Sequence, residues 1–172
     1  MIELEFINAC RLRDWDMINY IHTNFEINDY IINLCFCNSC RYNNYEIIDW
    51  LLYNYDIDIN CSAFKLACMN GNLDIVEWLY NQLIPNLDNI IISESFVNAC
   101  MGNNFYVVKW ILSKHNIENK YLENGLIHAC KNGYMEAAKI LIKHHPELIK
   151  YDVNKFIQLT NNSEILDLLK KN

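Results

Sequence analysis

The sequence predicts an all-α solenoid, a stack of five to six helix-turn-helix units, from three observations. A short motif recurs about every 30 residues, and a second apolar segment follows each copy at a constant distance. Only four Gly and two Pro occur in the whole chain, fewer than the turns of an all-β protein need. The 172 residues, 52% of them hydrophobic, suffice for one domain with a substantial core.

The recurring motif is a large apolar residue, two variable residues, a small residue and a cysteine. Five copies occur, and their cysteines follow one another at intervals of 30, 28, 32 and 30 residues. This spacing fits one face of an amphipathic helix, so we expect each motif to form the first helix of a unit. A cysteine acts as a small hydrophobe where helices cross, which predicts a packing role for Cys10, Cys40, Cys68, Cys100 and Cys130.

A second helix is predicted around the bulky residue that stands ten positions after each cysteine. An apolar pair precedes this residue and another apolar residue follows it, and four of the five units place an acidic residue in the first turn, which complements the helix dipole. The bulky residues are Tyr20, Trp50, Trp78, Trp110 and Ile140. We expect the three tryptophans to fill the core, so that Trp78→Ala costs about 3–5 kcal/mol through a cavity.

The two helices of each unit are separated by a short polar turn. The third and fifth units place Gly71 and Gly133 there, whereas the second and fourth use the pairs Asn43-Asn44 and Asn103-Asn104. Glycine and asparagine are the residues that best tolerate a left-handed helix cap, which predicts that conformation in each turn.

The chain is expected to form a single domain in which the last unit is degenerate. In that unit, Phe156–Thr160 and Ser163–Leu169 fit the two helices with a turn two residues shorter. The expected units span about 1–30, 31–59, 60–91, 92–121, 122–151 and 152–172.

Two segments of the third unit resemble a known family. Ser62–Cys68 resembles the Thr-Pro-Leu-His-x-Ala-Ala signature of the first ankyrin helix, and Asn70–Leu79 is similar to the second-helix sequence Asn-Gly-His-x-Asp-Val-Val-x-Leu-Leu. With Ala-Cys and Trp-Leu at the variable positions, the units look most like the ankyrin repeats of large AT-rich DNA viruses, the giant-virus type. The family's period is about 33 residues, and its hairpin Gly-Ala-Asp is absent here except for the remnant Asp58–Asn60. We therefore expect short or irregular connections instead of projecting β-hairpins.

The ankyrin resemblance implies a scaffold that recognises a protein through the concave face formed by the first helices and the turns after them. Arg, Tyr and Met, which are enriched at interfaces, occur among the positions concerned. For each position, and for His128 in particular, a merely solvated side chain is the alternative. The candidate partner-binding residues are Asn8, Arg11, Leu12, Asn38, Arg41, Tyr42, Met69, Asn70, Asn98, Met101, His128, Lys131 and Asn132.

A viral interaction module in the host cytoplasm is the first functional hypothesis. The alternative is a structural or self-assembling component, in which an otherwise monomeric chain pairs end to end through Ile2, Leu4 and Phe6. No nucleophile elbow, phosphate-binding glycine loop or zinc-protease sequence occurs, so we expect no catalytic residue and no cofactor.

Charge and hydropathy exclude two classes of partner. A net charge of −7 opposes phosphate binding, and the basic group of Lys139, Lys143, His144, His145 and Lys150 is too small to reverse this. No apolar run approaches the roughly 18 residues of a membrane helix. Acidic residues stand where a secretory signal would be basic, so we expect a soluble, intracellular protein without contact to nucleic acid or membrane.

One cysteine cluster has spacing that could suit a metal. Cys35, Cys37 and Cys40, with His22 or a fourth thiol, could in principle hold zinc. Packing is the preferred interpretation, because Cys40 belongs to the recurring motif and no second close pair of Cys or His completes a tetrahedral set. Without a signal peptide, we expect the eight cysteines to be thiols.

Overall fold

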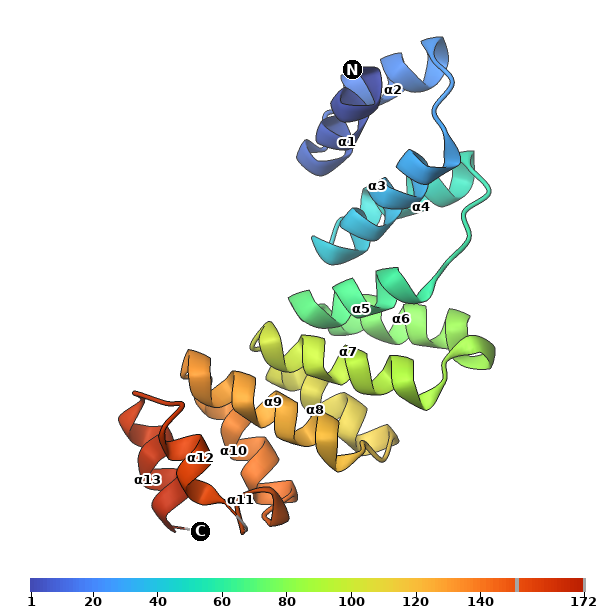
Figure 1. The fold of residues 1–172 in the computed structure, drawn as a ribbon. Helices are drawn as coiled ribbons and strands as arrows, with labels where there is room; N and C mark the ends of the chain where they lie inside the picture. Colours follow the sequence, from blue (N-terminus) through green and yellow to red (C-terminus); the bar gives the residue numbers. More distant parts are fainter. Residues whose placement is uncertain (151, 172) are drawn as a thin grey trace.

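The computed structural model describes residues 1–150 and 152–171 and confirms the all-α solenoid (Figure 1). These residues form thirteen α-helices and one short 3-10 helix, and none of them lies in a strand. The first five units are the helix pairs α1 (Ile2–Leu12) and α2 (Trp15–Asn24), α3 (Asp29–Arg41) and α4 (Tyr45–Asn54), α5 (Cys61–Asn70) and α6 (Leu73–Leu83), α7 (Asn89–Met101) and α8 (Phe105–Lys114), and α9 (Asn119–Asn132) and α10 (Met135–His144).

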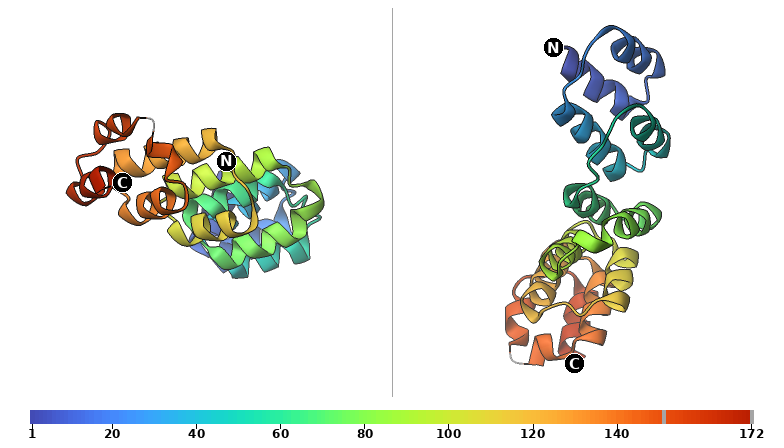
Figure 2. Two further views of the ribbon diagram at one scale, coloured as in Figure 1. Left: turned by 90° about the horizontal axis from the view of Figure 1, so that it is seen from below. Right: turned by 90° about the vertical axis from the view of Figure 1, so that its right-hand side faces the viewer.

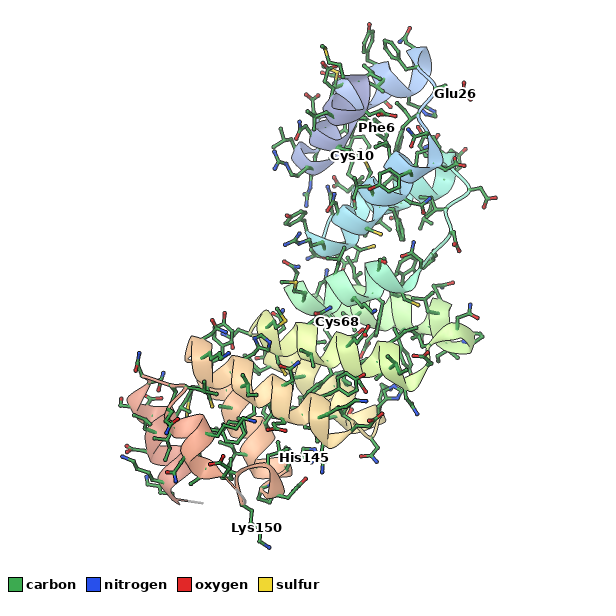
Figure 3. All side chains as sticks on the ribbon, in the orientation of Figure 1. Phe6, Cys10, Glu26, Cys68, His145 and Lys150 are labelled. Carbon is green, nitrogen blue, oxygen red and sulfur yellow. The ribbon has the colours of Figure 1, made fainter. Side chains whose placement is uncertain are left out.

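The last unit pairs α12 (Val153–Ile157) with α13 (Ser163–Lys171), as the degenerate repeat predicts. Two elements were not expected from the sequence. A 3-10 helix, η1 (Ile84–Asn86), extends the connection after α6, and the short α11 (Glu147–Lys150) follows α10. Figure 3 shows Lys150 at this end of the stack with its side chain pointing away from the ribbon.

The helices form two layers, one of first helices and one of second helices (Figure 2). Each first helix packs on the first helix of the next unit, from α1 to α9 and on to α12. In the first five units this packing is closer than that between the second helices, whereas at the last unit α13 packs on α10 more closely than α12 packs on α9. The short turns within units lie along one edge of the stack, and the longer connections between units lie along the opposite edge (Figure 1). Equivalent positions of successive units therefore lie next to one another along the stack.

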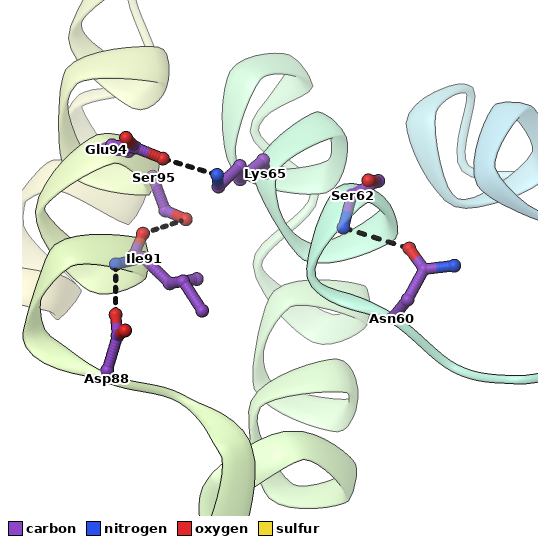
Figure 4. Close-up of polar contacts among 7 residues, drawn as sticks. All are labelled: Asn60, Ser62, Lys65, Asp88, Ile91, Glu94 and Ser95. Atoms are coloured by element: carbon purple, nitrogen blue, oxygen red, sulfur yellow. Dashed lines mark hydrogen bonds and ion pairs between the residues drawn. The ribbon is translucent and has the colours of Figure 1, made fainter.

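Side-chain caps fix where several first helices begin, because the first N–H groups of a helix lack partners within it. Asn28 Oδ1 accepts a hydrogen bond from the Ile31 N–H at 3.0 Å, and Asp88 Oδ1 accepts one from the Ile91 N–H at 2.7 Å. Asn60, from the hairpin remnant, caps α5 in the same way (Figure 4). These caps place α3 and α7 two and three residues earlier than the expected unit boundaries at 31 and 92.

The turn after the first helix contains a residue with left-handed backbone in each of the first five units, always three positions after the motif cysteine. Gly71 and Gly133 have φ of 85° and 71°, and Asn43 and Asn103 both have φ of 59°. Arg13, also at φ 59°, takes this conformation in the first unit although its side chain disfavours it. The position therefore requires a left-handed backbone whichever residue occupies it.

The centre of the core is formed by the large apolar residue of the motif. Phe6, Phe36, Phe64, Phe96 and Leu126 all have 0% exposure. The motif cysteines beside them are 0–2% exposed. The second helices add their apolar pairs, such as Ile75 and Val76, to the same continuous cluster.

The three tryptophans lie differently from the prediction: they flank the core and are only partly buried. Trp50 packs on Phe6 and Trp78 on Phe36, each with ring centroids 6.4 Å apart. Each of these two tryptophans thus covers the phenylalanine of the preceding unit from the outer layer. The apolar pairs of the second helices occupy the interior that the tryptophans were expected to fill.

The connections between units are extended or irregular segments, apart from η1 after α6 and α11 after α10. No described residue lies in a β-hairpin, in agreement with the degenerate fingers that the sequence predicts. Among the described residues, no helix combines the length and the apolar character that crossing a membrane requires.

Candidate protein-binding surface

The thirteen candidate residues lie along one edge of the stack, at the C-terminal ends of the first helices and in the turns after them. We call this set the turn ridge. None of its members is buried. Seven are exposed, namely Arg11, Leu12, Tyr42, Asn70, Met101, Lys131 and Asn132, and six are half-buried, namely Asn8, Asn38, Arg41, Met69, Asn98 and His128.

The position directly after the motif cysteine forms a column along the turn ridge. It is occupied by Arg11, Arg41, Met69, Met101 and Lys131 in successive units, whose first helices pack side by side. Among the described residues, no ion pair engages the two arginines or Lys131. A protein with a net charge of −7 thus carries here a column free of acidic side chains, with two methionines at its centre.

The first two units bring three ridge residues around one small cavity of about 10 Å³. Arg11, Asn38 and Tyr42 line it together with Cys10 and Cys35 from the core. Beside it, the Arg41 guanidinium carbon lies 5.2 Å from the centre of the Tyr42 ring, within the range of a cation–π contact. Arg41 Nε is buried and has no hydrogen-bond partner among the described residues, whereas Tyr42 is 52% exposed. Of this pair, the Tyr42 ring is the part that is accessible to a partner.

A groove of about 350 Å³ crosses the third to fifth units, and the sequence predicted only one of its residues, Asn98. Lys65 and Glu94, which form an ion pair between α5 and α7, line it, together with Tyr121 and Asn124 from α9 (Figure 4). These residues lie three, six or nine positions before a motif cysteine. A comparison of the polar residues at these three positions between neighbouring units could have revealed the groove residues from the sequence.

A second groove, of about 440 Å³, lies between α9 and the last unit. Lys131 is its only predicted member. Asn154, Lys155 and Gln158 also line it, and Lys155 forms an ion pair with Glu123 of α9. The sequence missed these residues because the last unit is degenerate and its alignment to the repeat is loose.

Two asparagines of the turn ridge are engaged within their own helices. Asn70 Nδ2 donates to the Leu66 carbonyl at 3.2 Å, and Asn132 Nδ2 donates to the His128 carbonyl at 2.9 Å. Both bonds stay within one helix and join residues four positions apart. These two side chains therefore have a local structural role beside any contact they make with a partner.

All eight cysteines are free thiols, and seven of them are buried. Burial raises the pKa of Cys40 to about 12 and that of Cys130 to about 11. A hydrogen bond with Cys10, followed by burial, raises the pKa of Cys35. Metal binding requires thiolates, which these environments disfavour. Among the described residues no group of three or more His, Cys, Asp or Glu side chains is arranged to hold a metal ion.

Comparison with known proteins identifies part of the chain by its sequence. Residues 34–79 match the family model described as "Ankyrin repeats (many copies)". The matched segment runs from within α3 to within α6, so it covers most of the second and third units. Neither the curated proteins nor the solved structures contain a match at comparable stringency. The helix pairs on both sides continue the matched segment in one stack, so the described residues form an all-α solenoid whose architecture is consistent with ankyrin repeats.

Proposed function

We propose that this protein is an interaction scaffold that binds a partner protein through its turn ridge. Ankyrin repeats generally serve as protein-protein interaction modules, and their all-α stacks are typical non-enzymatic scaffolds. The observation that carries the proposal is the column of Arg11, Arg41, Met69, Met101 and Lys131, whose basic side chains form no ion pairs among the described residues. Arginine and methionine are enriched at protein interfaces, and an unpaired guanidinium can bind a carboxylate of the partner.

The proposed setting is a virus-infected cell, with a host or viral protein as the partner. Support comes from the likeness of the units to the ankyrin repeats of large AT-rich DNA viruses and from the asparagine-rich composition, which is typical of AT-rich coding sequence. Affinity purification from infected or expressing cells tests this proposal, because the absence of any host or viral protein that is specifically retained would contradict it.

The binding surface is tested with the double variant Arg41→Glu and Tyr42→Ala against the purified partner. We expect the dissociation constant to rise at least about ten-fold while the urea melting curve is retained, because both side chains reach the surface. The matched control is Lys170→Glu with Tyr53→Ala, which makes similar changes at exposed positions outside the turn ridge. Equal loss of binding and folding in the test variant, or unchanged binding, would contradict the proposed surface.

Self-association is the second candidate function, and one observation favours it. Met17 and Tyr20 are 36% and 56% exposed, whereas the residues equivalent to Met17 in the next four units are buried. Leu4, at 63% exposure, is also available, but Phe6 is fully buried and cannot pair with another chain as expected from the sequence. Light scattering across a concentration series tests this function. A molar mass that stays that of a monomer excludes it. A molar mass that rises with concentration in the unmodified protein, but not in Tyr20→Glu, supports it.

A further inference from the structure

The second-helix layer has a groove between α8 and α10, on the layer that the turn ridge does not use. It consists of two adjoining hollows of about 300 and 220 Å³ that share Lys109, Ile140 and His144. Leu112 lines the first hollow, and Tyr106 and Lys143 line the second. Figure 3 shows His145, which lines the first hollow as well, at the end of α10.

The repeat itself explains why the groove lies between these two units. The position ten residues after the motif cysteine holds Trp50, Trp78 and Trp110 in the second to fourth units but Ile140 in the fifth. Trp50 and Trp78 cover the preceding unit by packing on its phenylalanine. Ile140 is smaller than a tryptophan and fills less of the surface between α8 and α10, and it lines both hollows.

The charge on the second helices reverses at the same place. Nine residues after the motif cysteine, the first five units carry Asn19, Asp49, Glu77, Lys109 and Lys139. The two lysines therefore lie at equivalent positions of neighbouring helices, and both line the groove. Tyr106 also replaces the acidic residue that the other four units place in the first turn of the second helix, so Glu136 is the one acidic side chain among the lining residues.

The three lysines of the groove have no acidic partner in the described part of the chain, whereas His145 at its edge pairs with Glu147. Lys65, Lys120 and Lys155 elsewhere form ion pairs with glutamates. Lys109 and Lys139 form none, and neither does Lys143, although all three are exposed. A cluster of unpaired lysines in a protein of net charge −7 favours an anionic ligand by local charge complementarity.

Apolar surface lies directly beside these charges. Tyr106 is 66% exposed and its ring stacks on Phe105 with centroids 4.1 Å apart, and Ile140 and Leu112 are half-buried. Simple anions would make no use of this surface, whereas a polypeptide with alternating acidic and apolar side chains can contact both the lysines and the apolar floor.

We propose that the groove between α8 and α10 binds an acidic peptide segment of a partner protein. Its Asp or Glu side chains pair with Lys109, Lys139 and Lys143, and an apolar side chain between them packs on Ile140 and Leu112. The groove is a second recognition surface, independent of the turn ridge, because it lies on the other layer of helices.

The test uses fluorescence anisotropy with a labelled synthetic peptide that alternates pairs of glutamate with single leucines. Lys109→Glu with Lys139→Glu reverses the charge of the groove. Lys170→Glu with Lys171→Glu is the matched control, because it changes the net charge equally at exposed positions on α13. Ile140→Trp introduces the residue of the second to fourth units and fills the groove without changing charge. Arg41→Glu with Tyr42→Ala tests independence from the turn ridge.

We expect saturable binding that weakens at least about ten-fold in the groove charge reversal and in Ile140→Trp, while the α13 control and the ridge variant bind as the unmodified protein does. Equal weakening in the α13 control would show attraction to net charge alone and overturn the proposal. Unchanged binding by Ile140→Trp would overturn the groove as the site. A single-stranded oligonucleotide or anionic vesicles that compete as well as the peptide would assign the surface to another class of ligand. Circular dichroism of each variant verifies that it is folded.

Discussion

The side-chain amide of Asn44 donates a hydrogen bond to the main-chain carbonyl of Cys10, 3.1 Å away, and so joins the second unit to the first. Asn44 is only 3% exposed. The same position in the fourth unit, Asn104, donates to the Met69 carbonyl at 2.6 Å, and Asn162 of the last unit donates to the Gly133 carbonyl at 3.4 Å. Carbonyl groups at the ends of first helices are thus satisfied by the next unit, which links the solenoid through polar as well as apolar contacts.

Replacing Asn44 therefore weakens the stack. We expect Asn44→Ala to lower the free energy of unfolding by about 1–3 kcal/mol, because the buried Cys10 carbonyl loses its donor. Asn44→Asp should cost more, since it places a negative charge against that carbonyl. Urea denaturation measures both variants. Asn70→Ala is the control, because the hydrogen bond of Asn70 is exposed and stays within its own helix. If Asn70→Ala lowers the free energy of unfolding as much as Asn44→Ala does, the hydrogen bond between units adds no more stability than an exposed bond within one helix.

Because the aromatic residues are buried to different extents, we expect their replacement by alanine to lower the free energy of unfolding by different amounts. Phe64→Ala should cost about 3–5 kcal/mol, because Phe64 is fully buried and its removal leaves a cavity. Trp78→Ala should cost less, about 2 kcal/mol, because the ring is partly exposed and mainly covers Phe36. Urea denaturation of both variants gives the order, and a larger loss for Trp78→Ala would contradict the flanking position of the tryptophans.

The left-handed turn of the first unit offers a stabilising substitution. Arg13 is exposed at φ 59°, a conformation that glycine adopts without a steric cost. We expect Arg13→Gly to raise the free energy of unfolding by about 0.5–1 kcal/mol. Leu12→Gly, one residue earlier and still helical, should lower it by a similar amount. Thermal melts compare the two variants, and destabilisation by Arg13→Gly would contradict a turn that is limited by backbone strain.

Thiol labelling should distinguish one cysteine from the other seven. Cys61 is half-buried at the start of α5, whereas the others are buried, and burial raises the pKa of Cys68 and Cys100. We expect a thiol reagent to modify Cys61 first in the native protein and all eight cysteines after denaturation. Mass spectrometry identifies the site, and Cys61→Ser should remove the fast phase. Rapid labelling of a motif cysteine would show that the stack opens locally.

Acidification should destabilise the protein through His115. Burial, aided by the neighbouring Lys114, lowers the pKa of His115 below its ordinary value of 6.5. The unfolded chain therefore takes up a proton at this group first, so the free energy of unfolding falls as the pH drops below 6.5, until His115 is protonated in the folded protein too. His115→Gln should flatten this part of the pH profile. The pKa of Glu147 is lowered below 4.5 by a backbone hydrogen bond and by His145, so its effect comes at lower pH. An unchanged profile in His115→Gln would contradict the prediction.

The class of fold could be predicted from the sequence, because repeat periodicity is a local property. The motif around Phe64 and Cys68 and the apolar pair Ile75-Val76 each mark one helix face, and Gly71 marks the turn between them. The positions of the turn ridge could be predicted from the same repeat, since the residue after each motif cysteine lies near the C-terminal end of a first helix.

The way in which neighbouring units meet could not be predicted from the sequence. Whether Trp78 fills the core or covers Phe36 depends on the offset between units, which no single repeat encodes. The bridge from Asn44 to Cys10 and the opening beside Ile140 likewise involve residues that are about 30 positions apart and are brought together only by stacking. Periodicity therefore specifies each helix pair, whereas the contacts and grooves that give the surface its chemistry arise from the packing of one pair on the next.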